Sequence, residues 1–565
     1  MYDPAPPGLA WWRPEDTPAD LDGPGDLPFE PPGRAMLDRP VFDLVEAAAD
    51  RWPEAVALRD DARILRYPEL RDATWRLAMR VAGATPRGTA VAVWLANGLD
   101  AAVALLACCA AGRPCLLLNA DFPPERVRAI LRDAAAAGII LARPASLPNL
   151  PDGVVPIVPD APAAHDATRQ SQAVALDPVG PDQAALAIYT SGSTGQPKGI
   201  VRSHRQTVYL GWKKVHRFHL RDADRVMTPY PVTSGPGIVT FMMTLIAGAS
   251  LYPVNIATRG ARAVLETARV AQITMITGLP ALLRMLLGLD GAQVAFSHLR
   301  AIYTTSESSL RADIDAWRSV LPPDCNVALV YGMSEGAPLT EWFLPRLLPD
   351  GPSRLPIGYP NPDLEFALTD AEGQPAAAGE AGALWVRGRL LSLGEWQGGR
   401  CVPGRMLRDP ADPSLLVLPT GDLVRRRPDG LIDFIGRADA QAKVRGNRVE
   451  PAEVEELLRR APEVGDAAVL VRRVGEDNAL VAFVVAAGET GAAQRPVLLQ
   501  RLRAALPPYM VPSRLHFVAR LPRMPGGKLD QRALATHDDA ARDDAGAPAT
   551  GLLARLGFPF RRSAR

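Results

Sequence analysis

The stretch YTSGSTGQPKG, residues 189–199, follows a short apolar segment, AALAIY (184–189), whose length and polar boundaries predict a buried strand. The stretch has three glycines, which allow backbone conformations that a side chain forbids. Such loops can turn several N–H groups toward one anion, and Lys198 adds a mobile positive charge suited to phosphate. We therefore expect a polyphosphate ligand. The expected contacts are Thr190, Ser191, Gly192, Ser193, Thr194, Gly195 and Lys198.

The loop does not have the spacing of a Walker phosphate-binding loop. That motif requires lysine directly after glycine, whereas Gln196 and Pro197 intervene here and Gly199 follows the lysine. A flexible Ser/Gly linker is a second alternative, but a lysine framed by proline and glycine directly after a strand argues against it. The loop thus indicates a polyphosphate site outside the P-loop NTPase fold.

Length and composition limit the class of protein. With 565 residues the chain is too long for one ordinary core, so we expect two or more domains. The formal net charge is +1, which gives no strong attraction to nucleic acid or to an anionic membrane. The apolar stretches are shorter than the ~20 residues of a membrane span. Five cysteines without C-x-x-C spacing, and no signal-peptide pattern, predict a cytoplasmic protein with reduced thiols.

The composition and the predicted secondary structure change along the chain. Residues 1–40 are rich in proline and acidic residues and are predicted to form an extended arm. From 41 to 436, segments typical of strands alternate with segments typical of helices, which indicates α/β layers with ligands at the carboxyl ends of strands. Residues 437–535 have the pattern of a compact α+β domain. The Ala-, Asp- and Arg-rich residues 536–565 are predicted to form a disordered tail.

Seven further motifs are independent of the glycine loop. They are LRYPEL (65–70), DFPPERV (121–127), YGMSEG (331–336), LPTGDLV (418–424), GRADAQAKVRGNRVEPAEVE (436–455), LPPYMVP (506–512) and PGGKLD (525–530). Their order and spacing resemble those of the adenylate-forming superfamily, which includes acyl-CoA synthetases, nonribosomal peptide synthetase adenylation domains and luciferases. The resemblance covers roughly residues 40 to 535 and is closest to a stand-alone adenylation enzyme.

The resemblance implies an α/β fold, with a large N-terminal domain of layered α/β subdomains and a small, mobile α+β domain at the C-terminal side. It also implies a reaction in two steps. A carboxylic acid is activated with ATP to an acyl-adenylate, pyrophosphate is released, and the acyl group then passes to a phosphopantetheine thiol. Attack of a carboxylate on the α-phosphate brings anions together, so the site must supply positive charge.

Several residues match the nucleotide site of the superfamily. Tyr331 matches the ring that lies on adenine, and Ser334 matches the hydroxyl near the α-phosphate. Asp422 matches the acid that binds both ribose hydroxyls, with Arg437 beside it. Glu335 matches the ligand of Mg²⁺, a metal that prefers hard carboxylate oxygens. The expected ATP site also includes Ser306 and Gly332.

Four residues in the C-terminal part match functions of the mobile domain. Lys528 matches the main catalytic residue, a lysine that bridges the substrate carboxylate and the α-phosphate. Asp439 matches the hinge, where a backbone rotation lets the small domain present different faces in the two half-reactions. Gly446 and Arg448 lie in the segment expected to dock during thiol transfer.

The expected acyl pocket carries no acidic side chain. Amino-acid-activating relatives usually place an aspartate against the substrate ammonium, and counting back from Gly248 puts Gly235 at that position. A buried ammonium without a counter-charge is costly. We therefore expect a substrate other than an ordinary α-amino acid, such as an aryl or alkyl carboxylic acid. The presumed pocket residues are Gly235, Pro236, Val239, Gly278, Tyr303, Thr305, Val330, Pro338 and Leu339.

The acceptor and one alternative reaction stay open at the level of sequence. VRGNRVEP (444–451) favours a separate carrier protein, since no carrier motif follows, whereas YGMSEG is nearer to acyl- and aryl-CoA ligases, whose acceptor is coenzyme A. GMSEG (332–336) also satisfies the G-x-S-x-G motif of serine hydrolases, with His516 and His537 later in the chain. The hydrolase interpretation leaves the other motifs unexplained, so we expect an ATP-dependent acid–thiol ligase.

Overall fold

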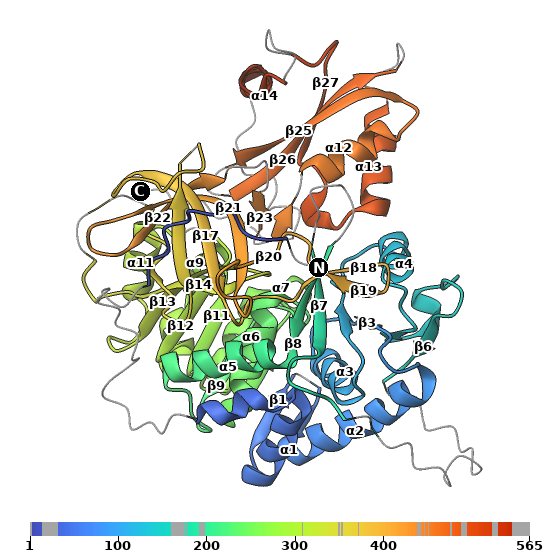
Figure 1. Ribbon diagram of the computed structural model, residues 1–565, viewed down its shortest axis with the longest axis vertical. Helices are drawn as coiled ribbons and strands as arrows, with labels where there is room; N and C mark the ends of the chain where they lie inside the picture. The colour runs from blue at the N-terminus through green and yellow to red at the C-terminus, as the bar shows by residue number, and fades with distance from the viewer. Residues whose placement is uncertain are drawn as a thin grey trace. The chain divides into compact units, whose positions relative to one another are not determined.

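The computed structural model contains two compact units, a large one that ends at Asp439 and a small one that follows it (Figure 1). The large unit combines sheets and helices in layers, and the small unit is α+β, so the predicted fold class is confirmed. The described residues are 3–13, 32–60, 62–159, 176, 178–190, 198–307, 309–348, 351, 354–370, 372–437, 442–445, 447–449, 451–474, 477–487, 494–522 and 529–544.

In the described part of the chain, the first sheet of the large unit has eight strands and includes the strand before the glycine loop. Its central strands, at residues 91–94, 115–117, 138–141 and 184–190, are short and mostly apolar runs, as expected for strands covered on both faces. The predicted strand before the loop is confirmed as β7 (Ala184–Thr190), and it pairs antiparallel with β8 (Lys198–Ser203). The order is β19 (Arg400–Val402), β18 (Gly394–Gln397), β8, β7, β4 (Cys115–Leu117), β3 (Val91–Trp94), β5 (Gly138–Leu141) and β6 (Val155–Ile157).

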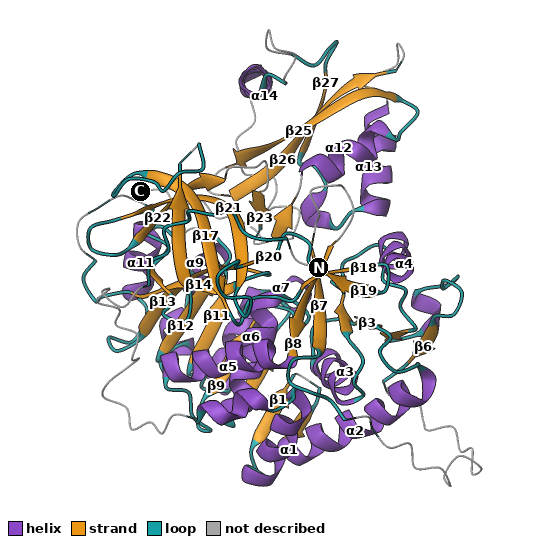
Figure 2. Cartoon of the chain, in the orientation of Figure 1, coloured by secondary structure: helices purple, strands orange, loops and turns teal. Residues whose placement is uncertain are grey.

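Among the residues that the structure describes, the second sheet has nine strands, and its central strands run parallel. Because parallel strands need crossover connections, helices separate them along the chain, as Figure 2 shows. The order is β15 (Tyr359–Pro360), β14 (Ala337–Phe343), β13 (Asn326–Met333), β12 (Ala301–Thr305), β11 (Met275–Gly278), β9 (Arg225–Thr228), β10 (Ser250–Pro253), β1 (Val56–Arg59) and β2 (Ile64–Arg66).

One apolar core joins the two sheets. Residues of α3 (Leu99–Ala110), α5 (His204–Phe218) and α6 (Gly235–Ala247) form a single buried cluster with residues of both sheets. Helices α3 and α6 are apolar on nearly all sides, which fits helices that are covered all round. The other helices of the large unit are η2 (Arg34–Asp38), α1 (Val41–Arg51), α2 (Tyr67–Ala84), α4 (Pro124–Asp133), η3 (Pro144–Ser146), α7 (Ile256–Arg259), α8 (Ala261–Val270), α9 (Pro280–Leu287), α10 (Ala292–Ala295) and α11 (Arg311–Arg318).

Helix α5 buries the charged side chains of Lys213, Lys214 and Arg217, which lie near the buried Glu341 of β14 and near Asp363, whose side chain is 33% exposed; these five residues are called here the α5 cluster. The ammonium of Lys214 donates to the Glu341 carboxylate, and Arg217 Nε lies 3.7 Å from Glu341 Oε2. Lys213 Nζ lies 3.7 Å from Asp363 Oδ2. Burial and the nearby Arg217 lower the pKa of Lys213 to about 7. Each charge in the cluster therefore has an opposite charge within the protein.

A third, antiparallel sheet carries the N-terminal segment along its edges. Residues 3–13 are described and are not a free arm, because Pro4 forms a bridge with Arg408 and Trp12 forms one with Phe366. Trp12 also stacks on Phe366 with ring centroids 5.3 Å apart. The strands are β16 (Glu365–Thr369), β17 (Ala381–Gly388), β21 (Leu416–Arg426) and β20 (Leu407–Arg408), with β22 (Ile432–Arg437) pairing with β21.

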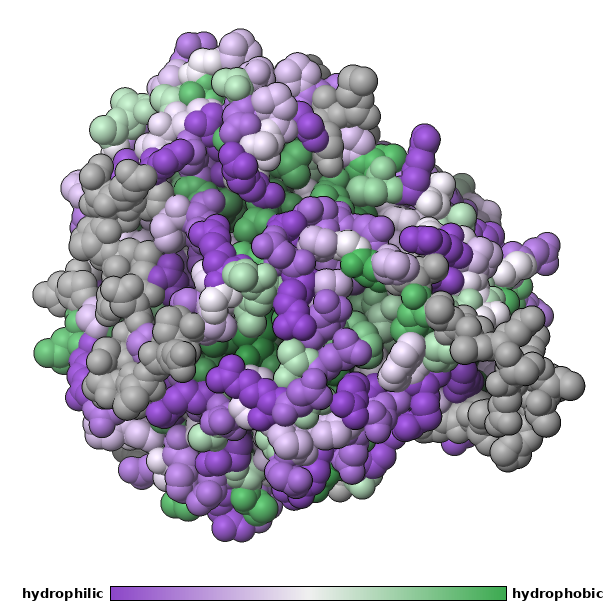
Figure 3. All heavy atoms as spheres, turned by 60° about the horizontal axis from the view of Figure 1, so that its bottom comes forward, coloured by the Kyte–Doolittle hydropathy of each residue, from purple (hydrophilic) through white to green (hydrophobic). Residues whose placement is uncertain are grey.

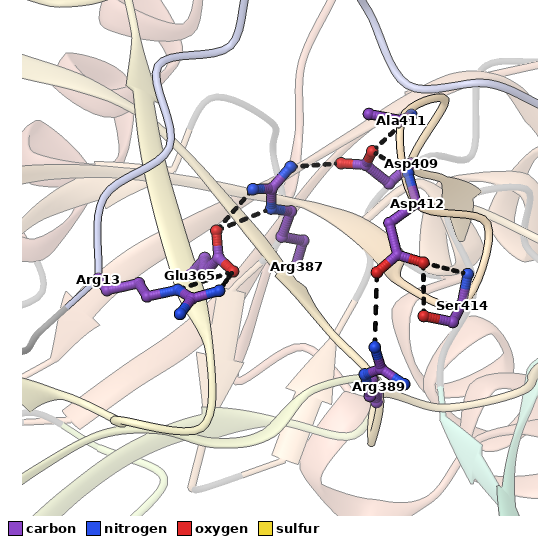
Figure 4. A network of polar contacts seen from close by, with 8 residues as sticks. All are labelled: Arg13, Glu365, Arg387, Arg389, Asp409, Ala411, Asp412 and Ser414. Atoms are coloured by element: carbon purple, nitrogen blue, oxygen red, sulfur yellow. Dashed lines mark hydrogen bonds and ion pairs between the residues drawn. The ribbon is translucent and has the colours of Figure 1, made fainter.

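A chain of ion pairs fastens the N-terminal segment to this sheet (Figure 4). Arg13 Nη2 lies 3.0 Å from Glu365 Oε1, and Arg387 contacts both Glu365, at 2.6 Å, and Asp409, at 2.6 Å. Asp409 in turn accepts hydrogen bonds from the backbone amides of the loop that follows it. The first described residues of the predicted arm are therefore held on the sheet by β-bridges, ring stacking and ion pairs.

The small unit is a three-stranded sheet with helices on both faces and a separate hairpin. Apolar residues of α12 (Pro451–Arg459) and α13 (Arg495–Ala505) pack on one face, and Leu534 of α14 (Gln531–Asp544) packs on the other. The remaining elements are β25 (Val464–Val474), β26 (Asp477–Ala486), β27 (Arg514–Phe517), η5 (Pro508–Met510) and the hairpin of β23 (Ala442–Val444) and β24 (Asn447–Val449).

The predicted disordered tail begins too early. Residues 536–544 belong to helix α14, and the reason is the buried carboxylate of Asp538. Arg514 donates two hydrogen bonds to Asp538, at 2.8 and 2.6 Å, and His516 Nε2 lies 2.9 Å from it. Residues 545–565 lie outside the described residues.

Hydrophilic side chains cover most of the face drawn in Figure 3, and hydrophobic atoms show between them as smaller patches. The exposed large hydrophobic residues are spread over the sequence, from Ile64 to Val497. Within the described part of the chain, no helix combines the length and hydropathy that crossing a membrane requires.

Candidate active site

Three predicted nucleotide-site residues meet at the junction of the second and third sheets. The hydroxyl of Tyr331, on β13, donates a hydrogen bond to Oδ2 of Asp422, on β21. Arg437 Nη1 donates to Asp422 Oδ1 at 2.5 Å, because Asp422 and Arg437 are directly paired on the antiparallel strands β21 and β22. Burial and the Asp422 carboxylate raise the pKa of Tyr331 well above its ordinary value. An aromatic ring and a carboxylate thus lie together, as recognition of a base and a diol requires.

The turn that carries Ser334 and Glu335 directly follows this strand. β13 has a register shift between Tyr331 and Gly332, and bulges of this kind re-aim side chains beside active sites. The Glu335 side chain is buried, and Arg405 Nη1 lies 4.0 Å from its Oε1. The Ser392 backbone amide donates to the Glu335 carbonyl at 2.8 Å, which fixes the turn. Ser334 itself is partly exposed.

The local structure does not match the nucleophile elbow of a serine hydrolase. That motif requires a strand, a sharp turn and a helix, whereas GMSEG (332–336) joins the antiparallel strands β13 and β14. In the small unit, His516 contacts the buried carboxylate of Asp538 and stacks on Phe483, with ring centroids 5.3 Å apart. The G-x-S-x-G match is therefore a coincidence of sequence.

Lys198 is the described side chain of the glycine loop. It opens β8, and its Nζ lies 3.4 Å from Oε2 of Glu395, a buried residue on the neighbouring strand β18. The next residue is Gly199. A larger residue at this position would clash, because its Cβ would lie 2.9 Å from the Tyr189 ring. Ser191, Gly192, Ser193, Thr194 and Gly195 lie outside the described residues, as does the side chain of Thr190.

Ser306 has a strained backbone directly after β12. Its φ is +77°, a conformation that costs a residue other than glycine about 1–3 kcal/mol and is concentrated at functional sites. The preceding carbonyl, of Thr305, accepts a hydrogen bond from the Tyr230 hydroxyl at 3.2 Å. Ser306 is partly exposed at the carboxyl end of the strand, where α/β sheets bind their ligands.

The predicted acyl-pocket residues fall into two groups. Parallel pairing aligns Thr305 of β12 with Val330 of β13, and Gly278 of β11 with the residue before Thr305. Gly235 and Pro236 begin helix α6 and are partly exposed. Val239, Tyr303 and Val330 share the large core cluster, whereas Leu339, next to Pro338 on β14, packs in the core of the third sheet.

Arg202 is a site residue that the sequence motifs do not include. It lies on β8, its Nη2 donates to the Ser334 carbonyl at 3.1 Å, and a Cβ built on Gly235 would be 3.9 Å from that nitrogen. It thereby links the predicted phosphate-side turn to the predicted acyl pocket. The available sequence signal was a single charge inside the otherwise uncharged run GIVRS (199–203).

The remaining predicted residues cannot be placed. Lys528, Asp439 and Gly446 lie outside the described residues, and Arg448 belongs to β24 without a described side chain. Their expected functions stay predictions.

Two α/β sheets with one common core, a third antiparallel sheet and a small α+β unit define the architecture of adenylate-forming enzymes. The chain belongs to the AMP-binding enzyme family. The model of this family matches residues 45–396, and that of the AMP-binding enzyme C-terminal domain matches residues 453–528. The predicted superfamily is therefore confirmed, and the matches are consistent with an AMP-forming ligase; transfer to a thiol stays a prediction.

The chain is similar to segments of much longer peptide synthetases. Phosphinothricin tripeptide synthetase PhsB from Streptomyces viridochromogenes is 33% identical over 529 residues, which are 92% of this chain and 43% of that protein. Tyrocidine synthase 3 from Brevibacillus parabrevis is 31% identical over 510 residues, 89% of this chain and 8% of that protein. The chain thus spans less than half the length of either relative.

Solved structures support the fold. The amide bond synthetase McbA from Marinactinospora thermotolerans has a TM-score of 0.73 at 23% identity, covering 87% of this chain and 99% of that one. NpsA-ThdA from Klebsiella oxytoca, an artificially fused adenylation–PCP di-domain, has a TM-score of 0.72 at 21% identity, covering 85% of this chain and 93% of that one.

Proposed function

We propose that the chain activates a carboxylic acid with ATP and transfers the acyl group to a phosphopantetheine thiol. The observation that carries the proposal is the contact of Tyr331, Asp422 and Arg437 beside the Ser334–Glu335 turn. These residues come from two sheets and from positions up to 106 apart in the chain (437 − 331), yet they form one polar group. Family membership supports ATP as the co-substrate.

In the first step, a carboxylate oxygen of the acid attacks the α-phosphorus of ATP, and the bond to pyrophosphate breaks. The Tyr331 ring would lie on the adenine, and Asp422 would accept hydrogen bonds from the ribose hydroxyls. Arg437 holds the Asp422 carboxylate in place, at 2.5 Å. Positive charge must balance the approaching anions, and we assign this to Lys198 and Lys528. Lys198 would exchange its contact with Glu395 for a phosphate.

Glu335 fits a magnesium site of the kind found on nucleotide phosphates. Mg²⁺ is usually held by one or two carboxylates together with substrate phosphates and water, and Glu335 supplies one buried carboxylate. Among the described residues, no three histidine, cysteine or acidic side chains gather as a complete protein cage. The ion would neutralise phosphate charge when bound.

In the second step, the thiol sulfur attacks the acyl carbon, the thiol proton is lost to solvent, and AMP leaves. We assign the change between the steps to a rotation at Asp439, which presents Lys528 first and the segment around Gly446 and Arg448 afterwards. The two compact units divide at Asp439, which supports a hinge there.

We propose a carrier protein as the acceptor, because the similar curated proteins are peptide synthetases and a similar structure contains a PCP domain. Coenzyme A is the alternative acceptor, and an o-succinylbenzoate CoA synthetase is among the similar folds. Gly235 at the position of the expected aspartate supports an acid other than an ordinary α-amino acid.

The test is acid-dependent pyrophosphate release with hydroxylamine as the trap for the adenylate. One panel holds the proteinogenic amino acids, and the other holds aryl, fatty, 2-oxo, 2-hydroxy and dicarboxylic acids. We expect signals in the second panel, and we expect Lys528→Ala to lower them ~100-fold or more. Silence in both panels contradicts the proposed activity. A strong α-amino acid signal keeps the activity and contradicts the substrate class.

A further inference from the structure

Arg202 is a buried charge in an apolar layer of the large unit. It is 2% exposed, and its neighbours on β8, Ile200 and Val201, belong to the apolar interior. Burying an ionised side chain is costly unless it is paired and hydrogen-bonded. Burial lowers the pKa of Arg202 to about 10, so the guanidinium stays charged near neutral pH.

The guanidinium is incompletely satisfied within the described residues. Its Nε and Nη2 both donate to the Ser334 carbonyl, at 3.4 and 3.1 Å. Nη1 is buried and has no hydrogen-bond acceptor among the residues that the structure describes. Glu335 and Tyr303 lie close enough to interact with the charge electrostatically. A buried donor without an acceptor calls for an explanation, and a ligand oxygen supplies one.

The position of the guanidinium relative to Gly235 indicates which ligand group it would meet. A Cβ on Gly235 would lie 3.9 Å from Arg202 Nη2 and 4.0 Å from the Ile188 side chain, both ordinary van der Waals distances. The substituent next to the reacting carboxylate is expected at this position. A carboxylate on residue 235 would attract an ammonium, whereas the charged atom that the described residues place within 4 Å of a Cβ at this position is a guanidinium nitrogen, so the preference is inverted.

We propose that Arg202 selects a carboxylic acid that carries an oxygen acceptor close to its reacting carboxylate, as an oxo, hydroxyl or second carboxylate group, and rejects an α-ammonium. This inference rests on the proposed function. The acceptor would take the hydrogen bonds that Nη1 and Nη2 can still donate. An ammonium in the same place would meet a like charge in a low-dielectric interior.

We expect Arg202 to discriminate strongly between acids that carry the oxygen acceptor and acids that lack it. A site built to hydrogen-bond one substrate group rejects an analogue that lacks it by up to ~10⁴–10⁵-fold, because its own polar groups are left unpaired. Arg202 keeps its hydrogen bond to the Ser334 carbonyl whichever acid is bound, which makes the expected discrimination smaller than that limit. We therefore expect at least a ~100-fold higher kcat/KM for oxygen-bearing acids than for matched acids without the oxygen.

The test compares matched acids in the pyrophosphate assay on the whole chain. One set is 3-phenylpropanoate with its 2-oxo, 2-hydroxy and 2-amino derivatives, and a second set is butanoate with succinate. The ratio of kcat/KM between oxygen-bearing and plain acids is measured for the wild type, Arg202→Met, Arg202→Lys and Arg205→Met. Ratios do not depend on the amount of folded enzyme. Arg205 is the matched control, since it pairs with Asp38 and Asp182.

We expect the ratio to fall close to 1 in Arg202→Met, to fall less in Arg202→Lys, and to stay at its wild-type value in Arg205→Met. A preference for succinate identifies a second carboxylate as the acceptor, and a preference for the 2-oxo or 2-hydroxy acid identifies a neutral oxygen. An unchanged ratio in Arg202→Met, with all acids slowed equally, overturns the inference alone. No adenylation of any acid by the wild type overturns the proposed function and this inference with it.

Discussion

Two groups of buried charges lie in the large unit, and they differ in what balances them. In the α5 cluster, Lys214 and Arg217 face Glu341, and Lys213 faces Asp363. At the candidate site, the described hydrogen bonds of Arg202 go to the Ser334 carbonyl, and Nη1 has no acceptor among the described residues.

The difference shows how structural and functional charges can be told apart. In the α5 cluster each of the three cations has a carboxylate within 4.0 Å, because Lys214 and Arg217 share Glu341, and the side chains of Lys214 and Glu341 are 0% and 4% exposed. The candidate site adjoins partly exposed positions, among them Tyr331, Ser334 and Gly235. Burial alone therefore does not identify a functional charge. A missing hydrogen-bond acceptor does not identify it either, since Lys213 Nζ also has none among the described residues. The informative feature is a buried cation that has no carboxylate within 4.0 Å in the described part of the chain and lies beside partly exposed positions.

The largest effect is expected from breaking the α5 cluster. Glu341→Gln leaves Lys214 and Arg217 without their carboxylate, and removing one partner of a buried pair costs about 3–5 kcal/mol. All ten tryptophans lie at or before Trp396, so tryptophan fluorescence in a urea titration reports on the large unit.

The triple variant Lys214→Met, Arg217→Met and Glu341→Leu is the control, because it exchanges both cations together with their shared carboxylate, and replacing a buried ionic group by apolar residues is often nearly neutral. A loss below about 1 kcal/mol for Glu341→Gln would show that the cluster is not a closed ionic unit.

A smaller effect, on binding, is expected at the candidate site. Asp422→Asn keeps the shape but removes the charged acceptor from Tyr331 and Arg437, so ATP should bind about 10- to 100-fold more weakly, since charge-assisted hydrogen bonds contribute about 1.5–3 kcal/mol. Isothermal titration with ATP measures the change. Glu365→Gln, an arginine-paired carboxylate on the same sheet, is the matched control and should leave ATP affinity unchanged. Equal affinities in wild type and Asp422→Asn would remove Asp422 from the ribose site.

The smallest expected effect is on the pH dependence of the free energy of unfolding. Burial, followed by Arg217, lowers the pKa of Lys213 to about 7. Above that pH the folded protein loses the proton while the unfolded chain keeps it up to about pH 10.4, so the unfolded state binds more protons and stability rises with pH. The free energy of unfolding of the wild type should rise relative to that of Lys213→Met between pH 7 and 8, by at most about 1.4 kcal/mol. Parallel pH curves would show that Lys213 stays charged in the fold.

Many helices and strands could be predicted from the sequence, because each depends on the pattern of apolar and polar residues within its own segment. FDLVEAAADRW (42–52) predicts a helix and α1 covers Val41–Arg51, while NVALVYG (326–332) predicts a strand and β13 covers Asn326–Met333. Residues 536–544 were misjudged because their helix depends on a long-range contact, between Asp538 and Arg514.

The site could be predicted where motifs mark it and not where tertiary contacts create it. Tyr331 and Asp422 each belong to a motif, but the hydrogen bond between them joins two sheets across 91 residues. Arg202 has no motif, and its burial follows from the pairing of β8 with both β7 and β18, which no local pattern reveals. Lys528 and Asp439 were assigned by resemblance and stay predictions.

The N-terminal segment has a consequence for protein synthesis. Arg13 leaves the ribosome early, but its partner Glu365 lies 352 residues further along the chain. At about 5–20 residues per second, the segment waits about 20 to 70 s for the sheet that it joins. During that interval Trp11 and Trp12 have no Phe366 or Arg387 to cover them. The N-terminal segment can therefore join this sheet only after Glu365, Phe366 and Arg387 have been synthesised.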